Sequence, residues 1–141
     1  MRQYHTEIVV DAPVDRVWNV LTDFSAYPTW NPLVGWLQGD IYASGQIQMW
    51  INPLNRSFNA TLTRVQENEA LIWVGVQGAS WLLSGEHYYQ LEELGEASTR
   101  LLHGEYFRGL GSWFIRNATL QTMEQAFIQH NRLLKERIED V

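Results

Sequence analysis

The sequence contains no cysteine, which removes several classes of chemistry. Disulfide bonds, thiolate nucleophiles and cysteine-based zinc or iron–sulfur sites all require that side chain. No stretch approaches the roughly 18 consecutive apolar residues of a membrane-spanning helix. Lys and Arg form no run, and the net charge of -6 argues against sequence-independent binding to nucleic acid. We therefore expect no nucleic-acid partner and no integral membrane association.

The first residues also lack the apolar segment of a secretory signal, which predicts a cytoplasmic protein. A chain of 141 residues can bury a sizeable core without a metal or disulfides, and we expect one domain over residues 1–141 and no cofactor. Aromatic residues, in contrast, are abundant, with seven Trp, six Tyr and five Phe. Composition alone leaves two interpretations open, an aromatic-rich core and the lining of an apolar cavity.

Periodicity predicts one strand and two short helices at the start of the chain. Apolar and polar residues alternate over 4–10, which is typical of a strand. Asp11 and Pro13 are helix-start signals, and we expect Asp11 to be the N-cap. The helix that follows presents one apolar face, made of Val14, Val17, Trp18 and Leu21. Spacing of three predicts a second short helix that ends between two prolines, with Phe24, Tyr27 and Trp30 on its face and Pro28 and Pro32 at its end.

The middle of the chain reads as antiparallel strands and the end as one long helix. Alternation predicts strands near 47–51, 58–62, 71–76, 85–91 and 99–107, with a bulge or bend at Gly75. From about Ser112 an apolar stripe predicts a helix of about 25 residues, interrupted at Asn131 with His130 beside it. The stripe comprises Leu120, Met123, Phe127, Leu134 and Ile138. This order predicts an α+β fold in which a curved antiparallel sheet wraps around the long C-terminal helix.

Two motifs near the start resemble a known superfamily. The run from Ile8 to Trp18 contains "APVDRVW", and "YPTWNP" spans Tyr27 to Pro32. Both are similar to the opening of START-like (SRPBCC) domains, and the resemblance extends over nearly the whole chain. It implies a helix-grip fold with a deep apolar cavity between the sheet and the long helix. Families in this superfamily include polyketide cyclases, lipid-transfer domains, hormone receptors, coenzyme-Q-binding proteins and chaperone co-activators. We interpret "YPTWNP" as a structural motif that fixes a chain reversal.

The most suggestive stretch for chemistry is "LLHGEYF", from Leu101 to Phe107. Residues two apart in a strand point to the same side, so His103 and Glu105 should stand together. They could perform acid–base catalysis with help from His87, form hydrogen bonds to a ligand, or satisfy one another structurally. A bulge at Gly85 or Gly104 would instead move some of them to solvent. A zinc site of the same three residues has acceptable ligands but no helical motif to frame it, so we expect no metal.

Placing the more apolar sheet face inward gives a candidate ligand-binding set. It comprises Met49, Phe58, Trp73, His87, Tyr89, Leu101, His103, Glu105, Phe107, Leu120, Met123, Phe127 and Asn131. The Gly109–Gly111 region should hinge the connection into the long helix as a lid, with Trp113 and Phe114 guarding the entrance or packing against the body.

The resemblance and the candidate set together predict binding of a small hydrophobic or aromatic ligand, such as a lipid, a polyketide-like molecule or an isoprenoid. The alternative is an enzyme of the polyketide cyclase/dehydratase type that uses His103 and Glu105 as an acid–base pair. No sequence feature favours a third class, protein interaction. Ligand identity and oligomeric state, monomer or homodimer, are not determined by the sequence.

Overall fold

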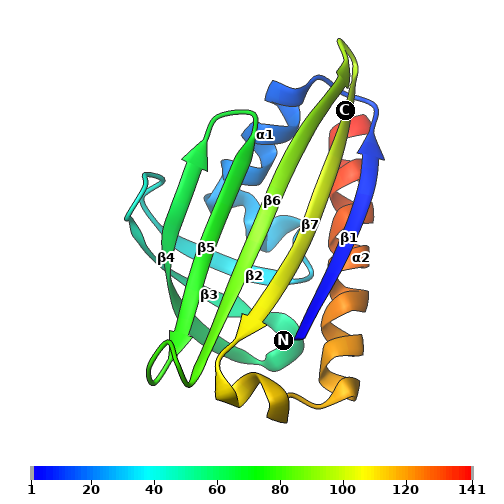
Figure 1. The fold of residues 1–141 in the computed structure, drawn as a ribbon. Helices are drawn as coiled ribbons and strands as arrows, with labels where there is room; N and C mark the ends of the chain where they lie inside the picture. The colour runs from blue at the N-terminus through cyan, green and yellow to red at the C-terminus, as the bar shows by residue number, and fades with distance from the viewer. Residues whose placement is uncertain (1, 141) are drawn as a thin grey trace.

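In the computed structural model, which describes residues 2–140, seven antiparallel strands form one sheet in the order β1-β7-β6-β5-β4-β3-β2 (Figure 1). The strands are β1 (Arg2–Val10), β2 (Val34–Gly39), β3 (Gln46–Ile51), β4 (Arg56–Gln66), β5 (Ala70–Gln77), β6 (Leu83–Gly95) and β7 (Ser98–Arg108). The α-helices are α1 (Val14–Thr22) and α2 (Asn117–Glu139), and the short 3-10 helices are η1 (Phe24–Thr29), η2 (Asn52–Leu54) and η3 (Leu110–Phe114).

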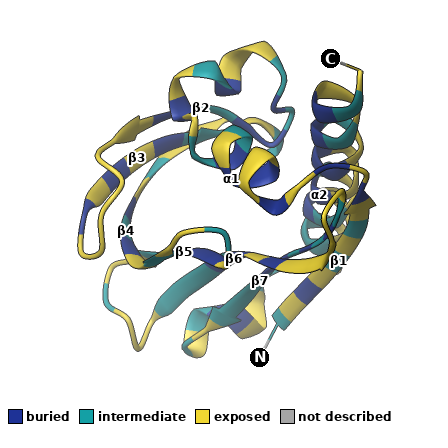
Figure 2. Cartoon of the chain, turned by 90° about the horizontal axis from the view of Figure 1, so that it is seen from above, coloured by how far each residue is buried: buried dark blue, intermediate teal, exposed yellow. Residues whose placement is uncertain are grey.

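The sheet curls into a half-barrel, and α2 runs beside β1 along its concave side (Figures 1 and 2). The predicted apolar stripe explains this position, because Met123, Phe127, Leu134 and Ile138 are all buried. The interruption of the stripe at His130 and Asn131 is buried as well. The predicted α+β helix-grip fold, with two short helices after the first strand, is confirmed. Among residues 2–140, neither α-helix combines the length and hydropathy needed to cross a bilayer.

One strand was missed. Periodicity placed five strands after the short helices, whereas the described chain has six, because β2 showed no clear alternation. Its pairing with β3 shifts register between Val34 and Trp36, so the buried positions of β2 are Val34 and Leu37, three apart instead of two. An irregularity of this kind removes the period on which the sequence signal depends.

The predicted end of η1 between Pro28 and Pro32 is confirmed, since its last residue is Thr29, but two other local predictions are corrected by the structure. Pro13, and not Asp11, is the N-cap of α1, and the Asp11 backbone N–H instead donates to the Glu139 carboxylate at 2.7 Å. The long helix begins at Asn117, because Ser112 belongs to η3.

Gly75, Gly85 and Gly104 do not disturb the alternation of the sheet. Gly75 pairs regularly with Ala60 and with Gly85, so the predicted bulge there is wrong; the register of β4 against β5 shifts between Leu62 and Arg64. Gly85 and Gly104 also lie in unbroken pairing between β6 and β7. The side chains of β6 and β7 therefore keep the inward and outward order that alternation assigns to them.

The "YPTWNP" motif reverses the chain into β2. The Asn31 Oδ1 atom accepts hydrogen bonds from the backbone N–H groups of Leu33 (3.0 Å) and Val34 (2.8 Å), an Asx-type turn. Trp30 packs against Tyr27 and against His130, with ring centroids 5.5 and 5.1 Å away. These contacts are structural, as the sequence interpretation proposed.

Candidate functional site

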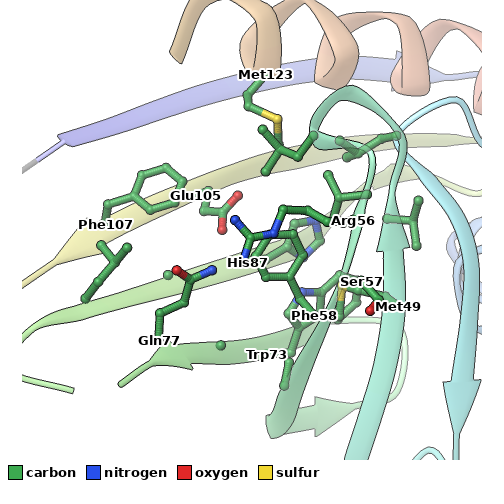
Figure 3. Close-up of a pocket in the computed structure, with 18 of the residues that line it drawn as sticks. Met49, Arg56, Ser57, Phe58, Trp73, Gln77, His87, Glu105, Phe107 and Met123 are labelled. Carbon is green, nitrogen blue, oxygen red and sulfur yellow. The ribbon is translucent and has the colours of Figure 1, made fainter. Parts of the chain in front are cut away.

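A cavity of about 570 Å³ lies between the concave face of the sheet and α2 (Figure 3). Its size falls in the range of roughly 300–1,000 Å³ that is typical of pockets for small molecules. The lining is mainly apolar and aromatic, with side chains from β3, β4, β5, β6, β7 and α2. Nine of the thirteen predicted site residues line it, namely Met49, Phe58, Trp73, His87, Glu105, Phe107, Leu120, Met123 and Phe127.

The other four predicted residues lie behind the cavity wall. Tyr89, Leu101, His103 and Asn131 are fully buried between the sheet and α2 and do not line the cavity. They share the inward face of the sheet, or the inward stripe of α2, with the lining residues. Alternation assigned the face correctly, but it carries no information about how deep in the concave side a residue lies.

Asn131 fixes where the protons of the buried polar groups reside. The Thr6 hydroxyl donates its single proton to the His103 carbonyl oxygen (2.6 Å), so it accepts the bond from Asn131 Nδ2 (2.8 Å). Asn131 Oδ1 therefore faces the imidazoles, and it accepts from the Nδ1–H groups of His103 (2.8 Å) and His130 (2.9 Å). Both histidines therefore carry a proton on Nδ1, and because burial lowers their pKa values they are neutral, with no proton on Nε2.

The remaining ring nitrogens follow from that assignment. The unprotonated Nε2 of His130 accepts from the Tyr89 hydroxyl at 2.8 Å. The unprotonated Nε2 of His103 accepts from the Nε2–H of His87 at 2.7 Å. His87 consequently carries no proton on Nδ1, and this buried nitrogen has no hydrogen-bond partner in the part of the chain that the structure describes. We call Thr6, His87, Tyr89, His103, His130 and Asn131 the histidine network.

Burial keeps the histidine network uncharged. Desolvation lowers the pKa of His130 to about 4 and lowers the pKa values of His87 and His103 well below their ordinary range. Stacking encloses the rings further, with His87 parallel to Trp73 at 3.9 Å and His103 against Phe127 at 4.2 Å. The wall that His87 presents to the cavity is therefore neutral.

Glu105 is the titratable carboxyl group that faces the cavity from the floor of the sheet (Figure 3). Its Oε1 atom accepts a hydrogen bond from the Tyr4 hydroxyl at 2.8 Å, and no protein donor among residues 2–140 bonds to Oε2. Gly85 provides the room for this carboxyl, because a Cβ atom there would lie 2.8 Å from Oε2. Desolvation raises the pKa of Glu105 to about 7, so near neutral pH the group exists in both protonation states.

His103 and Glu105 share a face but not a hydrogen bond. Glu105 bonds to Tyr4, and His103 bonds to His87 and Asn131. The Nε2 atoms of His87 and His103 lie 2.7 Å apart, too close for a metal ion to bind between them. Within residues 2–140 no group of three or more His, Cys, Asp or Glu side chains is arranged to hold a metal ion.

The open end of the cavity carries polar side chains that the candidate set lacked. Arg56 and Gln77 line it, and Figure 3 shows both extending toward Glu105. The Arg56 guanidinium carbon lies 5.0 Å from the centroid of the Phe58 ring, a cation–π contact. Arg56 follows a turn, and no spacing rule assigns a direction to such a residue.

Comparison with known proteins now decides the family. The family model described as "Polyketide cyclase / dehydrase and lipid transport" matches residues 1–139. The chain belongs to this family. The START-like resemblance of its opening motifs is thereby confirmed. No curated protein sequence matches the chain significantly.

Several solved structures share the fold of this family member, although their sequence identity to it is low. The Zhui aromatase/cyclase from Streptomyces sp. R1128 is 14% identical with a TM-score of 0.76, over 98% of this chain and 93% of that one. A START superfamily protein from Mycobacterium smegmatis is 18% identical with a TM-score of 0.72, over 98% and 97%. A hypothetical protein from Helicobacter pylori is 14% identical with a TM-score of 0.81, over 97% and 88%.

Family membership supports a ligand-binding or polyketide-cyclase role for the cavity without naming the ligand. Three polar residues of the site, besides those at the open end, were absent from the sequence-based set, namely Tyr4, Thr6 and His130. Tyr4 alternates with Thr6 on β1 and pairs with Glu105 across the strands, so register information would have found it. His130 interrupts the apolar stripe of α2 beside Asn131, and that gap was its only sequence signal.

Proposed function

We propose that this protein binds a small hydrophobic or aromatic ligand, of the lipid, polyketide-like or isoprenoid kind, in the cavity between the sheet and α2. The observation that carries the proposal is the combination of an apolar cavity of about 570 Å³ with one inward carboxyl group, Glu105. A cavity of that size whose walls are mainly apolar favours ligands that water solvates poorly.

The polar groups narrow the chemistry of the ligand. Glu105 Oε2 is free to accept a hydrogen bond from a ligand hydroxyl, or to donate one when the carboxyl is protonated. Because the histidine network is neutral, the deep wall offers a cationic or anionic ligand no counter-charge. An uncharged ligand with a hydroxyl or carbonyl group and an otherwise apolar body fits these conditions. Arg56 at the open end suits a polar tail.

A fluorescent probe tests the proposal with a matched pair of variants. Gly75 lines the cavity, and an added Cβ there meets only the Asn59 carbonyl oxygen at an ordinary 3.4 Å. Gly75→Leu should therefore fill the cavity without strain, whereas Val74→Leu adds bulk on the opposite face of the same strand. We expect saturable binding of N-phenyl-1-naphthylamine to the wild type and to Val74→Leu. Gly75→Leu should bind at least roughly tenfold more weakly. Equal binding by all three proteins would overturn the proposal.

A second candidate, catalysis of the cyclase/dehydratase type, rests on Glu105 alone. A carboxyl group with a pKa of about 7 can take and return a proton near neutral pH, and the Tyr4 hydroxyl that contacts it can orient it. His103 lies behind the cavity wall and does not line the cavity. In this candidate it would position His87 through their hydrogen bond and would not touch a substrate. Glu105→Gln should then abolish turnover of a polyketide-type substrate while leaving its affinity within about threefold. A variant that retains turnover would eliminate this candidate.

A further inference from the structure

Large apolar side chains are exposed around the open end of the cavity. Trp81 is 67% exposed, Trp113 68% and Phe114 84%. They belong to the β5–β6 connection and to η3, which protrude together at the lower edge of Figure 1. Of the two alternatives for Trp113 and Phe114, guarding the entrance or packing against the body of the protein, their exposure rules out packing. We call Trp81, Leu82, Leu110, Trp113 and Phe114 the aromatic tip.

The two segments of the aromatic tip are held together by their backbones. The Leu110 N–H donates to the Trp81 carbonyl (3.0 Å), and the Gly111 N–H donates to the Leu82 carbonyl (2.6 Å). Gly109 permits this approach, with φ of 94° and no space for a Cβ atom, which would lie 2.7 Å from Leu82. The exposed rings are thus mounted on a paired scaffold, and the neighbouring residues Leu83 and Ile115 line the cavity.

Charge is distributed unevenly toward the same end. The stretches 2–3, 52–58, 76–84 and 107–119 contain four arginines and no Asp or Glu, although the whole chain carries a net charge of -6. The arginines are Arg2, Arg56, Arg108 and Arg116. Hydrogen bonds anchor Arg2 at the start of α2, to Asn117 Oδ1 and the Ile115 carbonyl. Arg108 faces Glu86 at 3.7 Å, a loose ion pair on the outer side of the sheet.

We propose that the aromatic tip docks on the surface of an anionic lipid bilayer. Trp and Phe side chains partition into the interfacial region of a bilayer, and arginines bind the phosphate groups of lipids. Single rings that protrude from a convex tip suit a deformable lipid surface, whereas a protein partner would need a matching concave surface. Docking there would place the open end of the cavity against the lipid, so that an apolar ligand could pass between bilayer and cavity without crossing water.

Vesicle co-sedimentation tests the docking. We expect binding to vesicles of equal parts phosphatidylcholine and phosphatidylglycerol, weak binding to phosphatidylcholine alone, and weaker binding as NaCl is added. The double variant Trp113→Ser/Phe114→Ser should bind less by more than about tenfold. Arg108→Gln/Arg116→Gln should bind less by roughly 25-fold, about fivefold for each arginine.

Matched controls carry the same chemical changes elsewhere. Tyr42→Ser removes an exposed aromatic ring in the β2–β3 connection, and Arg64→Gln/Arg100→Gln removes two cations at the far ends of β4 and β7. Both control variants should bind vesicles as the wild type does. The proposal is overturned by a lack of binding to the anionic vesicles. It is also overturned if the control variants lose as much vesicle binding as the tip variants do. A third contradicting result is that the wild type self-associates instead of binding vesicles and that Trp113→Ser/Phe114→Ser abolishes this self-association.

Docking does not depend on what the cavity contains. Gly75→Leu should therefore bind vesicles normally even though it loses the naphthylamine probe. A failure of ligand binding and a failure of membrane docking are thus separate results.

Discussion

Substituting Asn131 by Leu should reveal how strongly the histidine network holds α2 to the sheet. Asn131 Oδ1 is the shared acceptor for the Nδ1–H groups of His103 (2.8 Å) and His130 (2.9 Å), and Leu has a similar size but no polar atom. The substitution leaves two fully buried imidazoles each with one unpaired nitrogen. A buried polar atom without a partner costs about 1–3 kcal/mol, so for the two nitrogens we expect a loss of about 2–6 kcal/mol in the free energy of unfolding.

Proton relocation cannot rescue the variant. If His130 moved its proton to Nε2, it could donate to the Tyr89 oxygen, but Nδ1 would remain buried as an unpaired acceptor. The same holds for His103, whose proton could move toward His87. Relocation therefore reduces the cost toward the lower limit of the expected range and does not remove it.

Urea unfolding at pH 7.5, followed by circular dichroism, measures this cost. Gln129→Leu is the matched control, because it removes an exposed amide from the same helix and should change stability by no more than about 0.5 kcal/mol. In the Asn131→Leu background, His103→Phe should cost less than it does in the wild type, because the partner of its Nδ1–H is already gone. If Asn131→Leu is as mild as Gln129→Leu, the assignment of these hydrogen bonds is refuted. Nitrogen-15 NMR of the imidazoles gives an independent check, with protons expected on Nδ1 of His103 and His130 and on Nε2 of His87.

Three further predictions follow from the buried groups. Between pH 6.5 and about 4, His130 binds a proton in the unfolded chain but stays neutral in the folded protein, so the free energy of unfolding should fall on acidification by up to about 3 kcal/mol from this residue. Urea unfolding midpoints measured across this pH range test the prediction. A flat profile would contradict the burial of His130 as a neutral group. The pH dependence that Glu105 contributes to stability has the opposite sign. Its pKa of about 7 in the folded protein exceeds the ordinary value of 4.5, so the fold favours the protonated form and this residue destabilises it as the pH rises. Glu105→Gln should therefore be more stable than the wild type at pH 8 by about 1–3 kcal/mol and show no gain at pH 4, with the exposed Glu7→Gln unchanged at both. Gly104→Ala should destabilise the protein by about 1–3 kcal/mol, because the added Cβ would lie 2.5 Å from the Tyr4 carbonyl oxygen and 2.6 Å from the Tyr88 hydroxyl. The control Gly95→Ala meets no atom within 4 Å and should leave stability unchanged. Equal melting temperatures for the two variants would refute the prediction.

The sequence predicted those parts of the fold that depend on regular periods. Alternation assigned the inward faces of β6 and β7 correctly, including Tyr89, Leu101 and His103, and the apolar stripe identified α2. Where the period failed, prediction failed too. β2 contains a register shift that hides its alternation, and Asp11 looked like an N-cap although Pro13 occupies that position.

The candidate site was predictable only to the level of a face. The alternation of a strand predicts that His103 and Glu105 point to the same side of the sheet. It does not predict that His103 lies behind the cavity wall whereas Glu105 faces the cavity. That difference depends on the curl of the sheet and on the placement of α2, which are properties of the whole chain. The links from His103 to Asn131 and from Glu105 to Tyr4 join residues 28 and 101 positions apart, and no local pattern encodes them.

Native mass spectrometry of freshly purified protein tests the central claim, a ligand-binding cavity, most directly. Wild type and Gly75→Leu would be prepared identically and then incubated with hydrophobic candidate ligands. We expect a noncovalent adduct of a small molecule on the wild type, retained from the cells or acquired from the panel, and none on Gly75→Leu. A wild type that carries no adduct in either preparation, or a Gly75→Leu variant that binds equally well, would contradict the claim.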